Sequence, residues 1–228
     1  MGPLNMTTFQ DKRMALHAAV ADIPSGASIF IGGFGGAGMP ARLLEALCAR
    51  TEVDNLTLIN NNAGAADVSF LQLVESGRVS RILCSYPRMP GSEPIRRQVQ
   101  AGQLEVVVMS QGTFVERIRA AGAGLGPFYT PTGYGTRFAE GKQTCIYQGR
   151  GHVLEEPLHA DYAFVKADVA DAMGNLTYRL AQRNFGPVMC TAARVTIVEA
   201  REVVTPGDLA PSSVVTPGVF VNRLVEVQ

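Results

Sequence analysis

A glycine-rich segment at residues 32–38 has the composition of a loop that binds an oxyanion. It reads GGFGGAG, follows the apolar run SIFI, and precedes Pro40 and the amphipathic stretch ARLLEALCAR. Glycine lets the backbone approach a ligand closely, and N–H groups at a helix N-terminus favour a phosphate, a carboxylate or a developing oxyanion. We therefore predict a ligand site formed by Gly32, Gly33, Phe34, Gly35, Gly36, Ala37 and Gly38.

Uncharged amide side chains follow two other predicted strands. Asn60, Asn61 and Asn62 come after LTLI, and Gln111 comes after LEVVVM. Residues at the ends of strands in open α/β sheets often meet ligands, and an amide can both donate to and accept from a carbonyl or carboxylate. The alternative is a turn, because asparagine tolerates left-handed backbone conformations and caps helices.

A longer glycine-rich stretch occupies residues 116–142, but it also carries charged, aromatic and proline residues. Pro127 and Pro131 restrict its path, and it contains Tyr134 and Arg137. A plain linker is rich in Gly and Ser alone, and long ordered loops in compact domains are usually functional. We predict a shaped binding or interface loop here rather than a solvated connection.

No residue pattern in the chain supplies an obvious nucleophile or metal site. There is no G-x-S-x-G motif, and the acids Glu116, Glu140, Glu155 and Glu156 lack a distinctive glycine-flanked setting. The histidines are isolated, and the four cysteines are far apart, which indicates reduced packing residues. The sequence predicts a binding site without its own nucleophile, and no metal.

Gly33, Gly35 and Gly38 also satisfy the dinucleotide-binding pattern G-x-G-x-x-G. That fold needs an acidic residue at the end of its second strand for the ribose hydroxyls, where this chain has asparagines. A nicotinamide cofactor is therefore disfavoured, while a tight turn of purely structural role stays open.

The elements that would position these residues alternate along the chain. Strands are predicted at residues 28–31, 56–59, 81–84, 104–109, 163–167 and 195–199. Helices are predicted at residues 9–20, 41–50, 68–76, 95–101 and 114–120. This order indicates an α/β fold, an open and mostly parallel sheet with helices on both faces. Residues 136–159 add a small antiparallel excursion, residues 9–228 form a single domain, and residues 1–8 are expected to be disordered.

Composition excludes several classes of protein. The 228 residues contain 20 Lys and Arg and 20 Asp and Glu, so no net field draws the chain to nucleic acid or to an anionic membrane. No apolar run approaches the length of a membrane span, and residues 1–25 lack the pattern of a secretory signal. We expect a cytoplasmic protein without nucleic-acid or membrane partners.

Together the motifs resemble the A (α) subunit of the family I coenzyme A transferases. They occur in the family's order, as IGGFGGAGMP, NNAG, QGTFVERIRAAGAG, FYTPTGYGT, AEGK, LEEPLHADYAFVKA, GNLTYR, RNFGPVM and VVTPGVFVNR. Within that family, CSYPR, GLGPFYTPTGYGT and PLHADYAFVKA are most similar to the 3-oxoadipate branch, with the acetoacetate-type enzymes close behind.

The resemblance implies transfer of coenzyme A (CoA) from succinyl-CoA to a 3-oxo acid through a glutamyl-CoA thioester. The nucleophilic glutamate belongs to a separate B (β) subunit, because its S-E-N-G motif is absent here and the nearest string, Ser92-Glu93-Pro94, lacks the Asn-Gly turn. No catalytic residue is thus expected in this chain. CoA is expected as a substrate thioester, and no permanently bound cofactor is implied.

The resemblance also assigns roles to the site residues. Residues 32–38 would line the CoA and oxyanion region, while Asn61 and Gln111 would hold the acyl carboxylate or keto oxygen. Asn61 is preferred because Asn60 stands where the family often has serine. Gly133 and Tyr134 would belong to a loop that closes over a cleft shared with the β subunit. Two rivals remain, a CoA-ester hydrolase of the same fold and a phosphate-ligand sensor that needs no partner.

Overall fold

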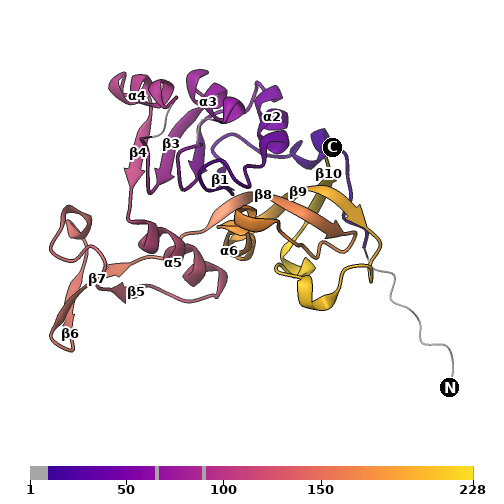
Figure 1. The fold of residues 1–228 in the computed structure, drawn as a ribbon. Helices are drawn as coiled ribbons and strands as arrows, with labels where there is room; N and C mark the ends of the chain where they lie inside the picture. The colour runs from indigo at the N-terminus through magenta and orange to yellow at the C-terminus, as the bar shows by residue number, and fades with distance from the viewer. Residues whose placement is uncertain (1–9, 65–66, 89–90, 228) are drawn as a thin grey trace.

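The protein is built on an open parallel sheet (Figure 1), as a computed structural model that describes residues 10–64, 67–88 and 91–227 shows. The strand order is β10-β9-β8-β1-β2-β3-β4, and every pairing in this sheet is parallel. The strands are β1 (Ser28–Ile31), β2 (Leu56–Ile59), β3 (Val79–Cys84), β4 (Glu105–Val108), β8 (Ala160–Asp171), β9 (Ala193–Val204) and β10 (Arg223–Glu226). The predicted α/β fold is confirmed.

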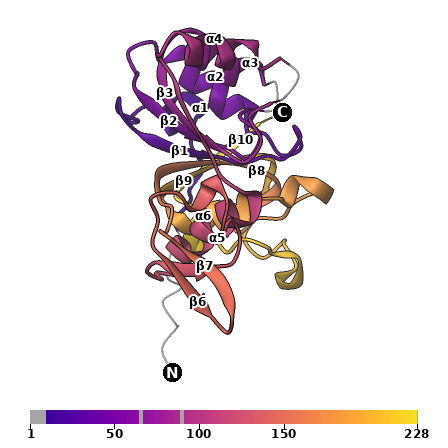
Figure 2. The same ribbon diagram turned by 90° about the vertical axis from the view of Figure 1, so that its left-hand side faces the viewer.

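Helices cover both faces of the sheet (Figures 1 and 2). One layer holds α1 (Leu16–Ala19), α2 (Ala41–Ala49), α3 (Val68–Glu75) and α4 (Glu93–Gln100), and the other holds α5 (Gln111–Gly122) and α6 (Gly186–Ala192). Each face of the sheet has its own hydrophobic core, and successive side chains of β1 point to opposite faces. Ile29 and Ile31 pack in one core, and Phe30 packs in the other with Phe114. A strand buried on both faces needs such an apolar run, which is what SIFI provides.

The strand order reverses direction between β1 and β8, and this point positions the candidate site. β1 pairs with β2 on one side and with β8 on the other. Ser28 fixes the start of this pairing, because its backbone N–H and its Oγ both donate to Asp161 Oδ2, at 3.0 and 2.7 Å. Ligands of open α/β sheets bind beyond the carboxyl ends of the strands at such a reversal, where the loop after β1 begins.

A small antiparallel sheet extends beyond α5 (Figures 1 and 2). Its order is β5-β7-β6, with β5 (Phe128–Thr130), β6 (Thr144–Tyr147) and β7 (Arg150–Glu155). Glu155 anchors it, because this carboxylate is only 3 % exposed and lies 2.6 Å from Lys142 Nζ. The predicted antiparallel excursion is confirmed, although it starts at β5 rather than at residue 136. We refer to residues 123–155 as the arm.

The helix predicted at residues 9–20 is wrong for most of its length. Only Leu16–Ala19 is helical, and the preceding backbone runs along β10, where Met14 N donates to Leu224 O at 2.9 Å. The outer edge of β10 has unpaired backbone groups that need partners, and this requirement overrides the local helical pattern. Residues 1–9, which include the segment expected to be disordered, lie outside the described residues.

Candidate active site

The glycine loop, residues 32–38, is a tight turn that projects between β1 and α2. Phe34 and Ala37 exchange two backbone hydrogen bonds of 3.0 Å across it. The two central residues, Gly35 and Gly36, have φ of +56° and +87°. Both lie in the left-handed region, which glycine enters without the steric penalty that other residues meet. The turn therefore requires its two central glycines, and it exposes them together with Phe34.

Several amide groups of this loop are already used within the protein. Those that donate outside the loop are Gly32 N to Phe164 O (3.0 Å), Gly33 N to Asn184 Oδ1 (3.1 Å) and Gly35 N to Asn62 Oδ1 (3.0 Å). By contrast, the N–H groups of Gly36 and Gly38 make no hydrogen bond to the described part of the chain. These two amides are the loop donors that remain for a ligand oxygen.

The N-terminus of α2 holds a carboxylate of the protein itself. Glu199 Oε2, from β9, accepts hydrogen bonds from the backbone N–H groups of Arg42 (2.9 Å) and Leu43 (3.1 Å). The Glu199 side chain is fully buried, and its Oε1 lies 3.5 Å from Lys166 Nζ. Anion capture by these helix amides, which the sequence suggested for a ligand, is thus used internally, and the open donors lie in the loop.

Stability should depend on pH through Glu199. Burial raises the pKa of this carboxyl above its ordinary value of 4.5, against the two amide hydrogen bonds and Lys166, which lower it. The folded protein therefore binds this proton more tightly than the unfolded chain. The resulting stabilisation is complete below pH 4.5 and is lost as the pH rises through the raised folded pKa. Glu199 and Lys166 line a surface pocket, whose other charged lining residues are Arg42, Asp168, Arg179 and Arg201.

Glu199→Gln removes the titrating group and keeps an oxygen for the α2 amides. We expect the free energy of unfolding of this variant, relative to wild type, to increase as the pH is raised from about 4 to about 8. Urea unfolding at a series of pH values measures the difference. A difference that does not change with pH would contradict the raised pKa.

The three consecutive asparagines after β2 have different roles. All are buried, with exposed fractions of 0 %, 1 % and 7 % in chain order. The Asn60 side chain shapes the turn, because its Nδ2 donates to Ile31 O (2.8 Å) and its Oδ1 accepts from Gly64 N (2.9 Å). Asn62 Oδ1 accepts from Gly35 N in the glycine loop. Asn60 therefore has the structural role in a turn that was the alternative to ligand binding. Asn61 instead contacts residues that follow the neighbouring strands.

Asn61 and Gln111, both predicted site residues, are in contact. Gln111 Nε2 donates to Asn61 Oδ1 at 3.2 Å, and Ser85 Oγ donates to the same oxygen at 2.6 Å. Gln111 is exposed at the first turn of α5, and its Oε1 makes no hydrogen bond to the residues that the structure describes. Asn61 thus fixes the amide nitrogen of the exposed Gln111. Ser85 was missed from the sequence, although it lies within the CSYPR motif.

Gly133 and Tyr134, also predicted, lie apart from this cluster on the arm. Tyr134 is 43 % exposed, and its ring packs against the backbone of Gly151 in β7, where a side chain would collide with it. Among the described residues, no hydrogen bond links either residue to the glycine loop or to Gln111. The structure therefore brings together the glycine loop, Asn61 and Gln111, but leaves the arm residues separate.

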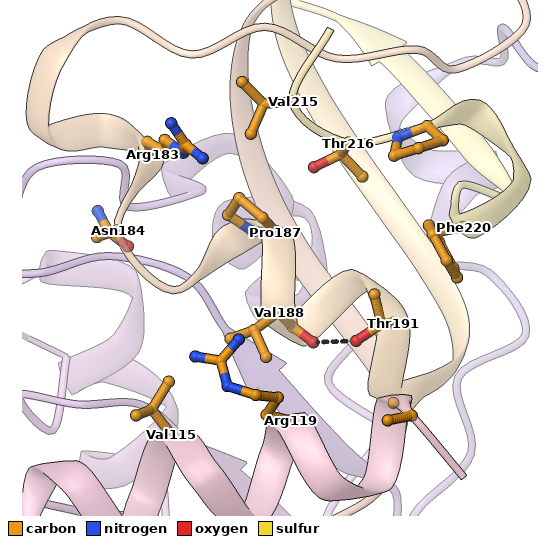
Figure 3. Close-up of a pocket in the computed structure, with 13 residues that line it drawn as sticks. Val115, Arg119, Arg183, Asn184, Pro187, Val188, Thr191, Val215, Thr216 and Phe220 are labelled. Atoms are coloured by element: carbon orange, nitrogen blue, oxygen red, sulfur yellow. Dashed lines mark hydrogen bonds between the residues drawn. The ribbon is translucent and has the colours of Figure 1, made fainter.

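A cavity of about 460 Å³ lies between α5, α6 and residues 215–220 (Figure 3). Val115 and Arg119 line it from α5, and Val188 lines it from α6. Arg183 and Asn184 lie at one side of it, and Asn184 is the lining residue that also bonds to the glycine loop. The cavity and the loop therefore share one side chain.

Burial makes two of the cysteine thiols poor nucleophiles. All four cysteines are free, and burial raises the pKa of Cys84 and of Cys190 to about 12. A thiol with such a pKa is protonated at neutral pH and unreactive. No group of three or more potential metal ligands is present in the ranges that the structure describes. In the same ranges, no helix is long and apolar enough to cross a membrane.

An open α/β sheet that gathers uncharged amide donors beyond the carboxyl ends of its strands suits a ligand with oxygen acceptors. The comparison with known families identifies the class of protein, because the model named Coenzyme A transferase matches residues 13–227. The chain belongs to the coenzyme A transferase family. Within it, the chain is an α subunit of family I.

Several curated relatives cover most of the chain. The α subunit of 3-oxoadipate CoA-transferase from Acinetobacter baylyi is 48 % identical over 219 residues, 96 % of each chain. Its namesake from Pseudomonas putida is 47 % identical over 93 % of this chain and 92 % of its own. The α subunit of acetate CoA-transferase from Escherichia coli is 43 % identical, over 95 % of this chain and 97 % of its own.

Solved structures share the fold at lower identity. Glutaconate CoA-transferase from Acidaminococcus fermentans superposes with a TM-score of 0.82 at 22 % identity, over 95 % of this chain and 75 % of that one. An acyl-CoA transferase from Escherichia coli O157:H7, as a thioester complex with CoA, gives a TM-score of 0.81 at 20 % identity. This match covers 96 % of this chain but 47 % of the larger one. At these identities the likeness concerns the fold alone.

Proposed function

We propose that the chain is the α subunit of a two-subunit enzyme that moves CoA from succinyl-CoA to 3-oxoadipate, with an αβ pair as the smallest active unit, in the cytoplasm. The observation that carries this proposal is the near-full-length similarity to 3-oxoadipate CoA-transferase α subunits, at 48 % and 47 % identity. The site supports it, because its uncharged amide donors suit acyl oxygens.

The proposed reaction uses a glutamate of the partner, the β subunit. Its carboxylate oxygen attacks the carbonyl carbon of succinyl-CoA, and the CoA thiolate leaves. These two events form a mixed anhydride of glutamate and succinate, and the thiolate attacks its glutamyl carbonyl, which forms glutamyl-CoA and releases succinate. The 3-oxo acid carboxylate then attacks glutamyl-CoA, the thiolate leaves, and a second mixed anhydride forms. The thiolate attacks the 3-oxoacyl carbonyl of this anhydride, which forms the new acyl-CoA and releases the glutamate. Splitting one exchange in this way replaces a difficult step by easier ones.

Each attack passes through a tetrahedral oxyanion, which preorganised donors stabilise. In this proposal, the N–H groups of Gly36 and Gly38 face that oxygen, and the rest of the loop from Gly32 to Ala37 shapes the CoA region. Gln111 binds a substrate oxygen directly. Asn61 holds Gln111 in place and lines the same pocket of the assembled enzyme.

The arm is proposed to contact both the substrate and the β subunit. Much of it is exposed, and its large apolar side chains facing solvent are Leu125, Tyr129, Tyr134, Ile146 and Tyr147. Exposed apolar surface of this kind is available for contact with a partner. We propose that Gly133 and Tyr134 close over a cleft completed by the partner.

Without the β subunit, the chain should be inactive. The test is succinyl-CoA-dependent formation of 3-oxoadipyl-CoA, measured for the purified chain and for the chain co-expressed with its candidate partner. We expect no turnover by the chain alone and turnover by the pair. Activity of the isolated chain would contradict the proposal, and release of free CoA without acyl acceptance would favour a hydrolase.

A second candidate acceptor is acetoacetate. The α subunit of succinyl-CoA:3-ketoacid coenzyme A transferase from Xanthomonas campestris is 42 % identical over 95 % of this chain, only slightly below the 3-oxoadipate relatives. Acetoacetate offered in competition with 3-oxoadipate distinguishes the two. Preference for acetoacetate would keep the mechanism and change the substrate, whereas transfer to neither acid would favour a sensor of phosphate ligands.

A further inference from the structure

Asn184 lies where two parts of the fold meet. It follows a short helical turn, η2 (Leu180–Arg183), and precedes α6. Its Oδ1 accepts hydrogen bonds from Gly33 N at 3.1 Å and from Phe185 N at 2.6 Å. Its Nδ2 donates to Ala37 O at 2.9 Å. One carboxamide therefore holds both stems of the glycine loop, one through an N–H group and the other through a carbonyl.

This arrangement requires an amide side chain. The two remaining contacts of Nδ2 are to the carbonyl oxygens of Ala181 (2.8 Å) and Gln182 (3.2 Å), so the same group also closes η2. A carboxamide combines an acceptor oxygen with a donor nitrogen, while a carboxylate has acceptors alone and would face three carbonyl oxygens. An apolar side chain would leave Gly33 N and Ala37 O without these partners.

Aromatic packing adds to the same clamp. The ring of Phe185, which follows Asn184, lies 6.2 Å from the ring of Phe34 in the loop and 5.7 Å from that of Phe114 in α5. Phe114 is fully buried in the core. Phe185 thus connects the exposed glycine turn to the buried core beside α5.

The clamp also decides which amides a ligand can use. Gly33 N donates to Asn184 and Gly35 N donates to Asn62. Gly36 N and Gly38 N have no partner among the described residues. Gly38 is held close as well, because a Cβ built on it would lie 3.0 Å from Asn184 Nδ2. The orientation of the two open amides thus depends on Asn184.

We propose that Asn184 is a positioning residue of the transferase, which sets the glycine loop for oxyanion binding without touching the substrate. This inference rests on the proposed function. Donors that stabilise an oxyanion must be placed before the reaction begins, and a displacement of about 1 Å can cost about a hundredfold in rate. A clamp of this kind should therefore act on kcat rather than on the binding of the acyl-CoA.

The test compares Asn184→Ala with Asn175→Ala, both as complexes with the β subunit. Asn175 is a matched control, because its side chain also bridges a loop, with Oδ1 accepting from Gly218 N at 2.8 Å and Nδ2 donating to Asp171 Oδ2 at 2.7 Å. We expect Asn184→Ala to lower kcat about 10- to 100-fold with KM for succinyl-CoA nearly unchanged. The control should lose a similar amount in Tm and keep its kcat.

Asn184→Asp gives a second readout. The carboxylate keeps an acceptor for Gly33 N but has no donor for Ala37 O until it is protonated. We expect the ratio of its kcat to that of wild type to rise as the pH falls, because the protonated form can donate again. A ratio that stays constant with pH, or a kcat of Asn184→Ala within about twofold of the control, would overturn the proposal.

Amide hydrogen exchange of the peptide that contains residues 32–38 separates this inference from the function on which it rests. Asn184→Ala should speed exchange in that peptide, in the isolated chain as in the complex, and Asn175→Ala should not. Unchanged exchange would overturn the clamp. If the wild-type complex transfers no CoA, the proposed function fails, and the exchange rates alone then decide whether Asn184 holds the loop.

Discussion

Gly38→Ala is expected to lower kcat/KM about 100-fold, because it disturbs the glycine loop in two ways. Gly38 has φ of +80°, where an L-residue costs about 1–2 kcal/mol. A Cβ at this position would also lie 2.7 Å from Gln182 O, a backbone atom that cannot rotate away. The loop or η2 must therefore shift, and the open amides of Gly36 and Gly38 shift with it.

Gly77→Ala is the control for the cost of placing alanine at a left-handed φ. Gly77 follows α3 with φ of +71°, and a Cβ there would meet nothing within 4 Å. It should lose a comparable amount of stability, about 1–2 kcal/mol by urea unfolding, and keep full activity in the complex with its partner. Full activity of Gly38→Ala would show that the turnover does not depend on the loop geometry described above.

Gln111→Ala should lower kcat/KM for the 3-oxo acid about 10- to 200-fold. Gln111 Nε2 donates one hydrogen to Asn61 Oδ1 and has a second one for a substrate oxygen, so the loss of this side chain leaves both oxygens with fewer partners. The fold should be little affected, because the side chain is at the surface and alanine is a good helix former. The measurement is steady-state kinetics of the assembled enzyme.

The matched control for Gln111→Ala is Gln72→Ala, another exposed glutamine on a helix, with no side-chain hydrogen bond among the described contacts. It should leave kcat/KM unchanged. Gln111→Glu adds a second test, because it keeps the shape but places a negative charge beside an incoming carboxylate, and its loss should be at least as large. An unchanged kcat/KM in Gln111→Ala would remove this residue from the site.

The parts of the fold that repeat a local pattern could be predicted from the sequence. β1 and β2 have the predicted bounds, and α2 and α3 differ from theirs by one residue at the end, because each carries its own apolar period and flanking turn. Other features could not be predicted from a local pattern, in addition to the helix expected at residues 9–20. α6 is only Gly186–Ala192, too short for a periodic signal, and β8 runs through Ala160–Asp171, well beyond the predicted 163–167, because β9 pairs with it throughout.

The candidate site was predictable to the level of segments but not of atoms. The sequence places the glycine loop, an asparagine run and Gln111 at three strand ends, and the structure brings these together. The sequence could not show that the buried Glu199 accepts hydrogen bonds from the α2 amides, or that Asn184 accepts one from Gly33 N. Both contacts join residues far apart in the sequence, where local composition carries no signal. Whether the loop, Asn61, Gln111 and the arm residues bind substrate stays a prediction.

The contact between Gly33 and Asn184 spans 151 positions of the chain, and this separation has a consequence for how the protein folds. β1 to β4 are neighbours both in sequence and in the sheet, so this half can assemble while synthesis continues. The glycine turn cannot take its final shape until β8 has inserted beside β1 and the segment with Asn184 has emerged from the ribosome. Such long-range closure slows folding. The glycine loop is thus synthesised early but reaches its final conformation late.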